Sequence, residues 1–156
     1  MVDADEVHSC REPLQDQYGY HLDPQAYLQA LPRLSGDLPP GAAEFATDPD
    51  HYNFRGSRCV KDLELGKATL VDSEEGISLE LVLAPNEWKH ESGLCIRYSD
   101  VQSFRTNVEE SDGTLPRLGA LQLDEVLPHP SGVSHEISFT WGSILVVAAD
   151  LVAVWV

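Results

Sequence analysis

Basic residues are scarce in this chain, which has ten lysines and arginines against 26 aspartates and glutamates and a formal net charge of −16 at pH 7. Residues 1–50 hold ten acids against two bases, residues 51–106 hold nine against seven, and residues 107–156 hold seven against one. Such a surface repels nucleic acid and anionic membranes, and it would attract a basic partner. An acidic surface also serves solubility or adaptation to salt, and the sequence leaves both interpretations open.

Cysteines are few and apolar runs are short. Cys10, Cys59 and Cys95 are widely spaced, which argues against a disulfide framework and for a reducing cytoplasm, although a Cys59–Cys95 bridge is a remaining alternative. The longest apolar run, 144–156, is interrupted by Asp150 and falls short of the roughly 18 residues that a membrane span needs. The N-terminus has neither a basic segment nor an apolar core, so we expect no secretory signal and a cytoplasmic protein.

Motifs for catalysis and metal binding are missing as well. The sequence contains no CxxC, HxH or HExxH spacing, no GxSxG elbow and no glycine-rich phosphate loop. His135 and Glu136 are adjacent on a predicted strand, so their side chains point to opposite faces and cannot converge on one substrate. We expect His135 to be partly buried and bonded to a backbone carbonyl or to Asp150. The chain is therefore predicted to be non-catalytic, with no metal and no cofactor.

Residues 1–20 are polar, acidic and without periodicity, and we predict a flexible acidic arm there. A helix is predicted over 24–31, because Asp23 suits the cap, Pro24 suits the first helical position, and three apolar side chains share one face. Pro32 is expected to end it. Residues 36–41 are predicted to form a linker or extended turn, and residues 44–50 a single helical turn or an irregular loop.

From Tyr52 onward the hydrophobic period changes from helical to two. Apolar and polar residues alternate over 59–65, 77–83, 94–98, 121–127 and 133–139, as in half-buried antiparallel strands. The segments 144–149 and 151–156 are apolar on both faces, which predicts a central strand covered on two sides with a bulge or bend at Asp150. A helical turn is possible at 98–104. We therefore predict a mainly β (α+β) fold over residues 21–156, an antiparallel sheet or β-sandwich of roughly seven strands with one short N-terminal helix.

Two loops combine aromatic side chains with charges. In the segment 86–91 a tryptophan stands among charged residues, and an exposed tryptophan in a loop is typical of a protein contact. Packing of this side chain over the edge of the core is the competing interpretation. The segment 48–58 is similar, with aromatic residues between acids and arginines. The residues predicted to bind a partner are Asp48, Asp50, Tyr52, Trp88, Glu109, Glu110 and Asp112.

Part of the chain resembles a known group of proteins. The strings concerned are Leu94, Tyr98-Ser-Asp-Val101 and Phe104, then Leu123-Asp-Glu-Val126, His135-Glu-Ile-Ser-Phe139, Gly142 and Asp150-Leu151. Over roughly residues 59–156 the pattern of strands and turns is similar to that of the small β-rich immunity proteins of bacterial polymorphic toxin systems. The resemblance implies an intracellular, non-catalytic protein that inactivates one toxin by covering its active site. It transfers no catalytic residue, and the acidic N-terminal arm departs from the pattern.

These observations favour an acidic binding protein, an immunity-type inhibitor of a basic toxin such as a nuclease. An alternative is an enzyme or a β domain that binds a small molecule or a carbohydrate in a pocket near Trp88, His90, His135 and Trp141. A third interpretation is a structural subunit whose acidity serves only solubility. The sequence does not choose among them.

Overall fold

The computed structural model describes residues 14–16, 19–21, 24–110 and 115–156. Two short strands near the N-terminus, β1 (Leu14–Asp16) and β2 (Gly19–His21), pair antiparallel. Most of the predicted flexible arm, together with Asp23 and Asp112, lies outside the described residues, so the arm stays a prediction.

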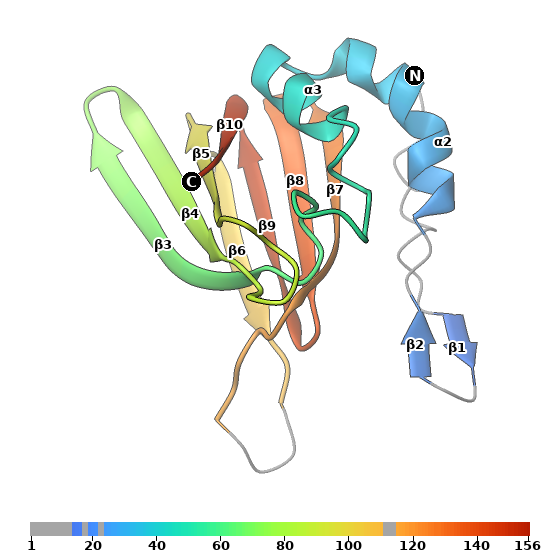
Figure 1. Cartoon of the computed structure of the whole chain (residues 1–156). Helices are drawn as coiled ribbons and strands as arrows, with labels where there is room; N and C mark the ends of the chain where they lie inside the picture. Colours follow the sequence, from blue (N-terminus) through green and yellow to red (C-terminus); the bar gives the residue numbers. More distant parts are fainter. Residues whose placement is uncertain (1–13, 17–18, 22–23, 111–114) are drawn as a thin grey trace.

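Two four-stranded antiparallel sheets form the body of the molecule (Figure 1). The first sheet has the strand order β10-β5-β4-β3, and the second has the order β6-β9-β8-β7. The strands are β3 (Glu64–Ser73), β4 (Gly76–Ala84), β5 (Leu94–Ser99), β6 (Ser103–Val108), β7 (Leu121–His129), β8 (Gly132–Phe139), β9 (Gly142–Ala148) and β10 (Asp150–Trp155). The predicted mainly β fold is confirmed, with eight strands in these sheets.

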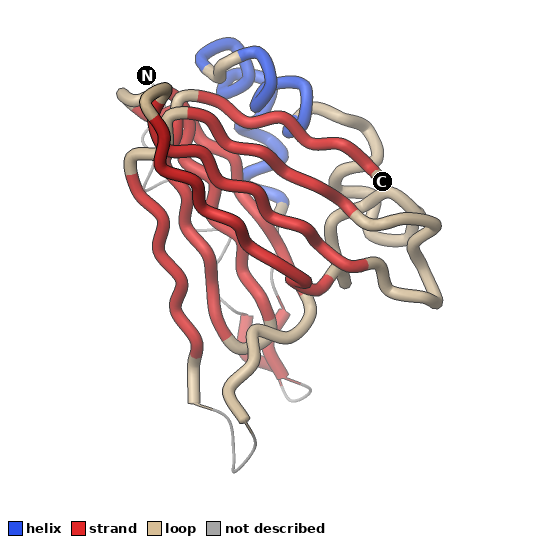
Figure 2. The backbone as a smooth tube through the Cα atoms, turned by 90° about the vertical axis from the view of Figure 1, so that its left-hand side faces the viewer, coloured by secondary structure: helices blue, strands red, loops and turns tan. Residues whose placement is uncertain are grey.

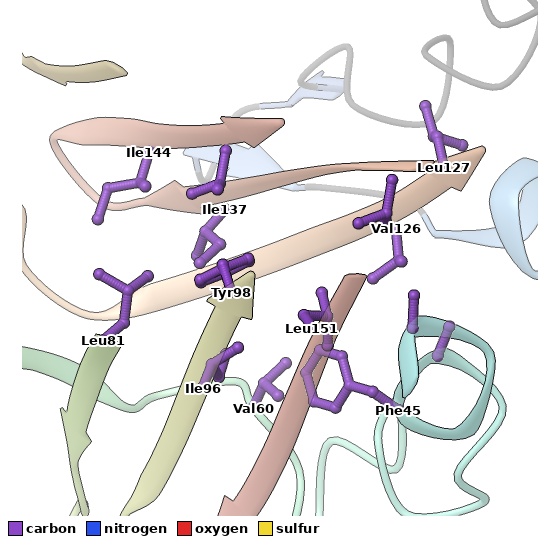
Figure 3. Packing of buried hydrophobic residues seen from close by; sticks show 14 of the residues in the cluster. Phe45, Val60, Leu81, Ile96, Tyr98, Val126, Leu127, Ile137, Ile144 and Leu151 are labelled. Atoms are coloured by element: carbon purple, nitrogen blue, oxygen red, sulfur yellow. The ribbon is translucent and has the colours of Figure 1, made fainter. Parts of the chain in front are cut away.

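The core lies between the two sheets (Figure 3). On β4 the buried side chains alternate with more exposed ones, and β8 shows the same period. Fully burying one aliphatic side chain contributes about 1.5–3 kcal/mol, so this period fixes which face of each strand points inward. Side chains at the centre of the cluster include Leu81, Ile96, Tyr98, Ile137 and Ile144, each at most 2% exposed.

The N-terminal helical region is longer than predicted. It comprises α2 (Gln25–Leu34), the 3-10 helix η2 (Ser35–Asp37) and α3 (Pro40–Ala46). The expected end at Pro32 is wrong, because α2 continues through this residue for two more positions and buries Leu34. The predicted linker is wrong in part, because Pro40 occupies the first turn of α3, where a missing N–H costs nothing. No helix in the described part of the chain is long and apolar enough to cross a membrane.

Three stretches of the strand prediction need correction. The segment 59–65 is mostly a loop, and β3 begins only at Glu64, because Asp62 has a positive φ of 75°. The rest of β3, up to Ser73, lies outside every predicted strand. The possible helical turn at 98–104 is instead the end of β5, a short connection and the start of β6.

The C-terminal apolar run forms one strand in each of the two sheets. β9 is an interior strand of the second sheet, whereas β10 is an edge strand of the first sheet. The expectation of cover on both faces is wrong for β10, since Val152 is 56% and Val154 50% exposed. Asp150 stands where the chain passes between sheets, and its carboxylate accepts hydrogen bonds from the amides of Gly41 (3.1 Å) and Ala42 (2.9 Å) in α3.

Candidate protein-binding site

The most distinctive polar cluster in the described residues is a buried chain of side chains centred on Asp124. The carboxylate of Asp124 on β7 lies 2.7 Å from His51 Nε2, in the loop after α3, and 2.7 Å from His135 Nε2 on β8. The other ring nitrogen of His135 lies 2.6 Å from the hydroxyl of Tyr98 on β5. The cluster therefore connects both sheets with the loop that leaves the helices.

The partners of each ring define its protonation. His51 Nδ1 lies 2.8 Å from the carbonyl of Phe45, so both nitrogens of His51 face acceptors and both must donate. Burial alone would disfavour this charged ring, but the charge and hydrogen bond of Asp124 outweigh burial and raise the pKa of His51. Burial likewise opposes the charge on Asp124, and the two histidines outweigh it and lower the pKa of that carboxyl. His135 Nε2 faces only the Asp124 carboxylate and so donates to it, while its Nδ1 faces the Tyr98 hydroxyl.

This cluster is an internal support and not an accessible site. His51, Tyr98, Asp124 and His135 are each at most 2% exposed. The expectation for His135 is therefore corrected: the ring is fully buried and bonds to Asp124 and Tyr98, not to a carbonyl or to Asp150. No group of three or more His, Cys, Asp or Glu side chains in the described ranges is arranged to hold a metal ion.

Trp88 is the most exposed large hydrophobic side chain of the described residues, with 96% of its surface accessible. It lies in the loop between β4 and β5. The side chain of Asn86 accepts a hydrogen bond from the Trp88 amide (3.0 Å), and the Asn86 carbonyl accepts from the amides of Lys89 (3.0 Å) and His90 (2.8 Å). The loop thus forms a closed turn that holds the backbone beneath Trp88.

Two side chains that follow Trp88 anchor the loop to the body of the protein. Lys89 Nζ donates to the Asp62 carboxylate (3.0 Å) and to the Lys61 carbonyl (3.3 Å). Burial opposes the charge on Asp62, but its bonds to the two lysines outweigh burial and lower the pKa of this carboxyl. His90 is buried, and its Nε2 lies 2.9 Å from the carbonyl of Cys59. The loop is therefore fixed on both sides of an exposed indole.

Trp88 borders a shallow hollow of about 300 Å³. The residues that line it are Asp62, Glu64, Pro85, Asn86, Glu87, Trp88 and Ala120. The charge of Asp62 is offset by the lysines, and Glu64 lies 3.6 Å from Arg117 across exposed surface. A smaller hollow of about 140 Å³ shares Glu64 and reaches Leu118 and Gly119. The indole of Trp88 therefore lines the larger hollow and not the smaller one.

The other residues predicted to bind a partner are not gathered around Trp88. Asp48 and Asp50 are exposed, but they directly follow α3, where the Asp48 carboxylate accepts from the amide of Asp50 (2.9 Å). Tyr52 is half-buried, and its hydroxyl donates to the carbonyl of Asp124 (3.1 Å). Glu109 and Glu110 are exposed after the end of β6. The predicted residues therefore occupy at least two separate parts of the surface.

The four side chains of the alternative pocket lie in different surroundings. His135 is part of the buried cluster in mid-strand, and His90 stacks on Trp155 with 6.2 Å between ring centroids. Trp88 points into solvent, while Trp141 is 44% exposed in the turn before β9.

Cys59 and Cys95 are both buried as free thiols, so the possible bridge between them is not formed.

No family model, curated protein or solved structure matches this chain. Its function is therefore inferred from its own surface.

Proposed function

We propose that the chain is a non-catalytic, acidic binding protein of the bacterial cytoplasm, an immunity-type inhibitor that neutralises a basic toxin by covering its active site. The observation that carries this proposal is the combination of an almost fully exposed Trp88 with a loop that is fixed by hydrogen bonds on both sides of it.

Charge brings the partners together. A net charge of −16 produces a field that attracts a basic protein over several ångströms at low salt and increases the rate of encounter. Beside Trp88 itself the charge is close to balance, because Lys61, Lys89 and Arg117 offset nearby carboxylates. We assign the acidic surface to long-range attraction and the Trp88 loop to the contact.

The Trp88 loop then supplies the affinity. Buried tryptophans dominate the energetics of many interfaces, and their truncation typically costs at least about 2 kcal/mol of binding free energy. Ordering a flexible loop would reduce this gain, but the turn at Asn86 and the anchors at Lys89 and His90 order it in the free protein. The indole would enter an apolar pocket beside the basic cleft of the toxin, and the exposed Glu87 would contact cationic side chains at its rim.

The test is capture of a partner at low salt with three baits: the wild-type chain, Trp88→Ala, and Val152→Ala as a control. Val152 is an exposed apolar residue on β10, far along the chain from the loop. We expect one basic protein that is retained by the wild type and the control and released by a salt step. Its Kd for Trp88→Ala should rise at least about 30-fold, which corresponds to ~2 kcal/mol.

The purified partner then provides the functional readout. If it is a toxin, one equivalent of the wild-type chain should abolish its activity, and Trp88→Ala should need a proportionately higher concentration. Capture of no basic protein at any salt concentration, or equal affinity of Trp88→Ala and wild type, would contradict the proposal.

A further inference from the structure

The four edge strands of the two four-stranded sheets, β3, β6, β7 and β10, differ in how far other parts of the chain cover them. At the β7 edge, the Tyr27 hydroxyl of α2 bonds to both the amide and the carbonyl of Val126, and the Tyr52 hydroxyl bonds to the carbonyl of Asp124. The amide and the carbonyl of Leu121 on the same strand pair with the loop at Leu63 and Asp62. The backbone groups of β7 at Val126 and Leu121 and the carbonyl of Asp124 are therefore satisfied.

The β10 edge is covered by α3. The approach is so close that a Cβ added to Gly41 would lie 2.0 Å from the carbonyl oxygen of Leu151. β7 and β10 lie on the same side of the sandwich, and the two helices lie on this side, α2 beside β7 and α3 against the start of β10 (Figure 1). The opposite side carries the β3 and β6 edges. In Figure 2 this side faces the viewer, and strands lie in front of the helices.

β3 is the longer of these two edges, with ten residues against six. Its register with β4 is irregular only between Leu65 and Lys67 and regular from there to Ser73. In this regular part Leu70 is 54% and Val71 47% exposed, although they point to opposite faces of the sheet. Leu70 pairs with the buried Leu79, so it lies on the core-facing side with no cover. Natural proteins protect such edges with proline, bulges or charges. On β3 the bulge, Lys67 and Asp72 flank residues 68–71, which themselves have no proline, bulge or charge.

We propose that this edge pairs with β3 of a second copy of the chain, antiparallel and centred on Leu70. A two-fold axis perpendicular to the sheet then places Leu70 opposite its own counterpart and Thr69 opposite Val71. Lys67 lies opposite Ser73 of the second copy, the last residue of its β3, and so faces the end of the hairpin where Glu74 and Glu75 form the turn. Eight strands would form one continuous sheet across the pair.

The charges of the β3 hairpin favour a second copy over an unrelated strand. Lys67 is the one basic residue of β3, and Asp72, Glu74 and Glu75 lie at the other end of the hairpin arm. An antiparallel arrangement brings the lysine of each copy to the acidic end of the other, so the strand is complementary to itself. Residues 51–106 also carry the smallest acidic excess of the chain, which limits repulsion at this contact.

The first experiment measures the mass of the full-length chain in solution by light scattering over a range of concentration and salt. We expect a dimer that dissociates on dilution and more readily at high salt. Leu70→Lys and Lys67→Glu should each be monomeric, and Lys67→Glu combined with Glu75→Lys should restore the dimer. Val152→Lys, at an exposed valine on the far edge strand of the same sheet, is the matched control and should remain dimeric. Circular dichroism and the Tm of each variant show that it is folded.

The second experiment tests the register by oxidation of one introduced cysteine in a Cys10→Ser background, in which the native thiols of Cys59 and Cys95 are buried. Leu70→Cys places two thiols directly opposite each other and should crosslink rapidly. Ala68→Cys lies on the same face, but the two copies of residue 68 are then offset by about 13 Å along the strands, beyond the reach of a disulfide.

Three results would overturn the proposal. These are a wild-type chain that stays monomeric at every soluble concentration, a Leu70→Lys variant that dimerises like the wild type, and equal crosslinking of the two cysteine variants. If the chain is always monomeric, the partner of this edge would have to be a strand of a different protein. Because Trp88 lies outside β3, Trp88→Ala should dimerise normally, so this proposal and the proposed function fail independently.

Discussion

The hydroxyl of Tyr27 is both donor and acceptor to one residue: it donates to the carbonyl of Val126 at 2.9 Å and accepts from the amide of Val126 at 3.1 Å. The two residues are 99 positions apart in the sequence. A single side chain thus replaces the missing neighbour strand of β7 at this position, and α2 is fixed to the second sheet by a polar contact in addition to its buried apolar face.

Tyr27→Phe should therefore destabilise the fold by about 1–3 kcal/mol, because two buried backbone groups lose their partner while the packing of the ring is retained. Urea unfolding followed by circular dichroism measures this. Tyr52→Phe is the comparison: it removes the bond to the Asp124 carbonyl and the contact with the Tyr27 hydroxyl but leaves the Val126 amide and carbonyl bonded, so we expect a smaller loss. A larger loss for Tyr52→Phe would contradict the role assigned to Tyr27.

Asp124→Asn should destabilise the fold more than Tyr27→Phe does. It leaves the doubly protonated His51 buried without an anion, and breaking one partner of a buried pair typically costs about 3–5 kcal/mol. Asp62→Asn removes a partly exposed carboxylate from its two lysines and should cost about 1 kcal/mol or less. Equal losses of unfolding free energy for the two Asn variants would show that His51 is not charged in the fold.

Stability should depend on pH through the same pair. The pKa of His51 is raised on folding, so its contribution is complete below about pH 6.5, the value for an unfolded histidine, and is lost as the pH rises through its folded pKa. The pKa of Asp124 is lowered, so its contribution is present above about pH 4 and is lost as the pH falls toward its folded pKa. The pair therefore stabilises most between these two values.

The measurement compares the free energy of unfolding at about pH 5.5 and about pH 8.5. The wild type should lose stability between the two, and His51→Gln should lose less because the titrating ring is gone. His129→Gln, at an exposed histidine at the end of β7, should follow the wild type. If His51→Gln lost as much unfolding free energy between the two pH values as the wild type does, the loss could not be assigned to titration of His51.

Asp150→Ala should reduce stability by about 0.5–2 kcal/mol, because the amides of Gly41 and Ala42 at the start of α3 lose their acceptor. Asp150→Asn keeps one acceptor oxygen and should lose less than Asp150→Ala. Asp72→Ala, at an exposed position near the tip of the β3–β4 hairpin, should have little effect. Thermal unfolding of the three variants distinguishes these outcomes, and identical Tm values for the Ala and Asn changes at Asp150 would argue against capping.

The strands that the sequence predicts correctly are those with one face against the core. Residues 133–139 alternate in sequence because every second side chain of β8 is buried. β6 lacks this signal, since exposed polar residues such as Thr106 share a face with Phe104 at the edge of the sandwich. β3 escapes prediction for a similar reason: Ala68 and Leu70 have the correct period, but the bulge near Gly66 shifts it and most of the strand is exposed.

The exposure of Trp88 agrees with its position among charges, whereas the buried cluster has no signal in the sequence. His51 and Asp124 are 73 residues apart, and each stands among residues typical of loops or polar strand faces. Pairing across the two sheets depends on how the strands stack, which local periodicity does not encode. The same limit explains why the sequence predicts a bulge or bend at Asp150 but not its hydrogen bonds to the N-terminus of α3.

The buried cluster also has a consequence for the order of folding. Asp124 and His135 can meet as soon as β7 and β8 form a hairpin, since they are 11 residues apart. Tyr98 and His51 reach them only after the two sheets have docked and the loop after α3 has closed, across 37 and 73 residues respectively. Contacts of such long range form late, and until then the charge on Asp124 is best kept in water. A second sheet that docked on the wrong partner would bury this carboxylate without its cation, so we expect the cluster to disfavour misdocked sheets during refolding.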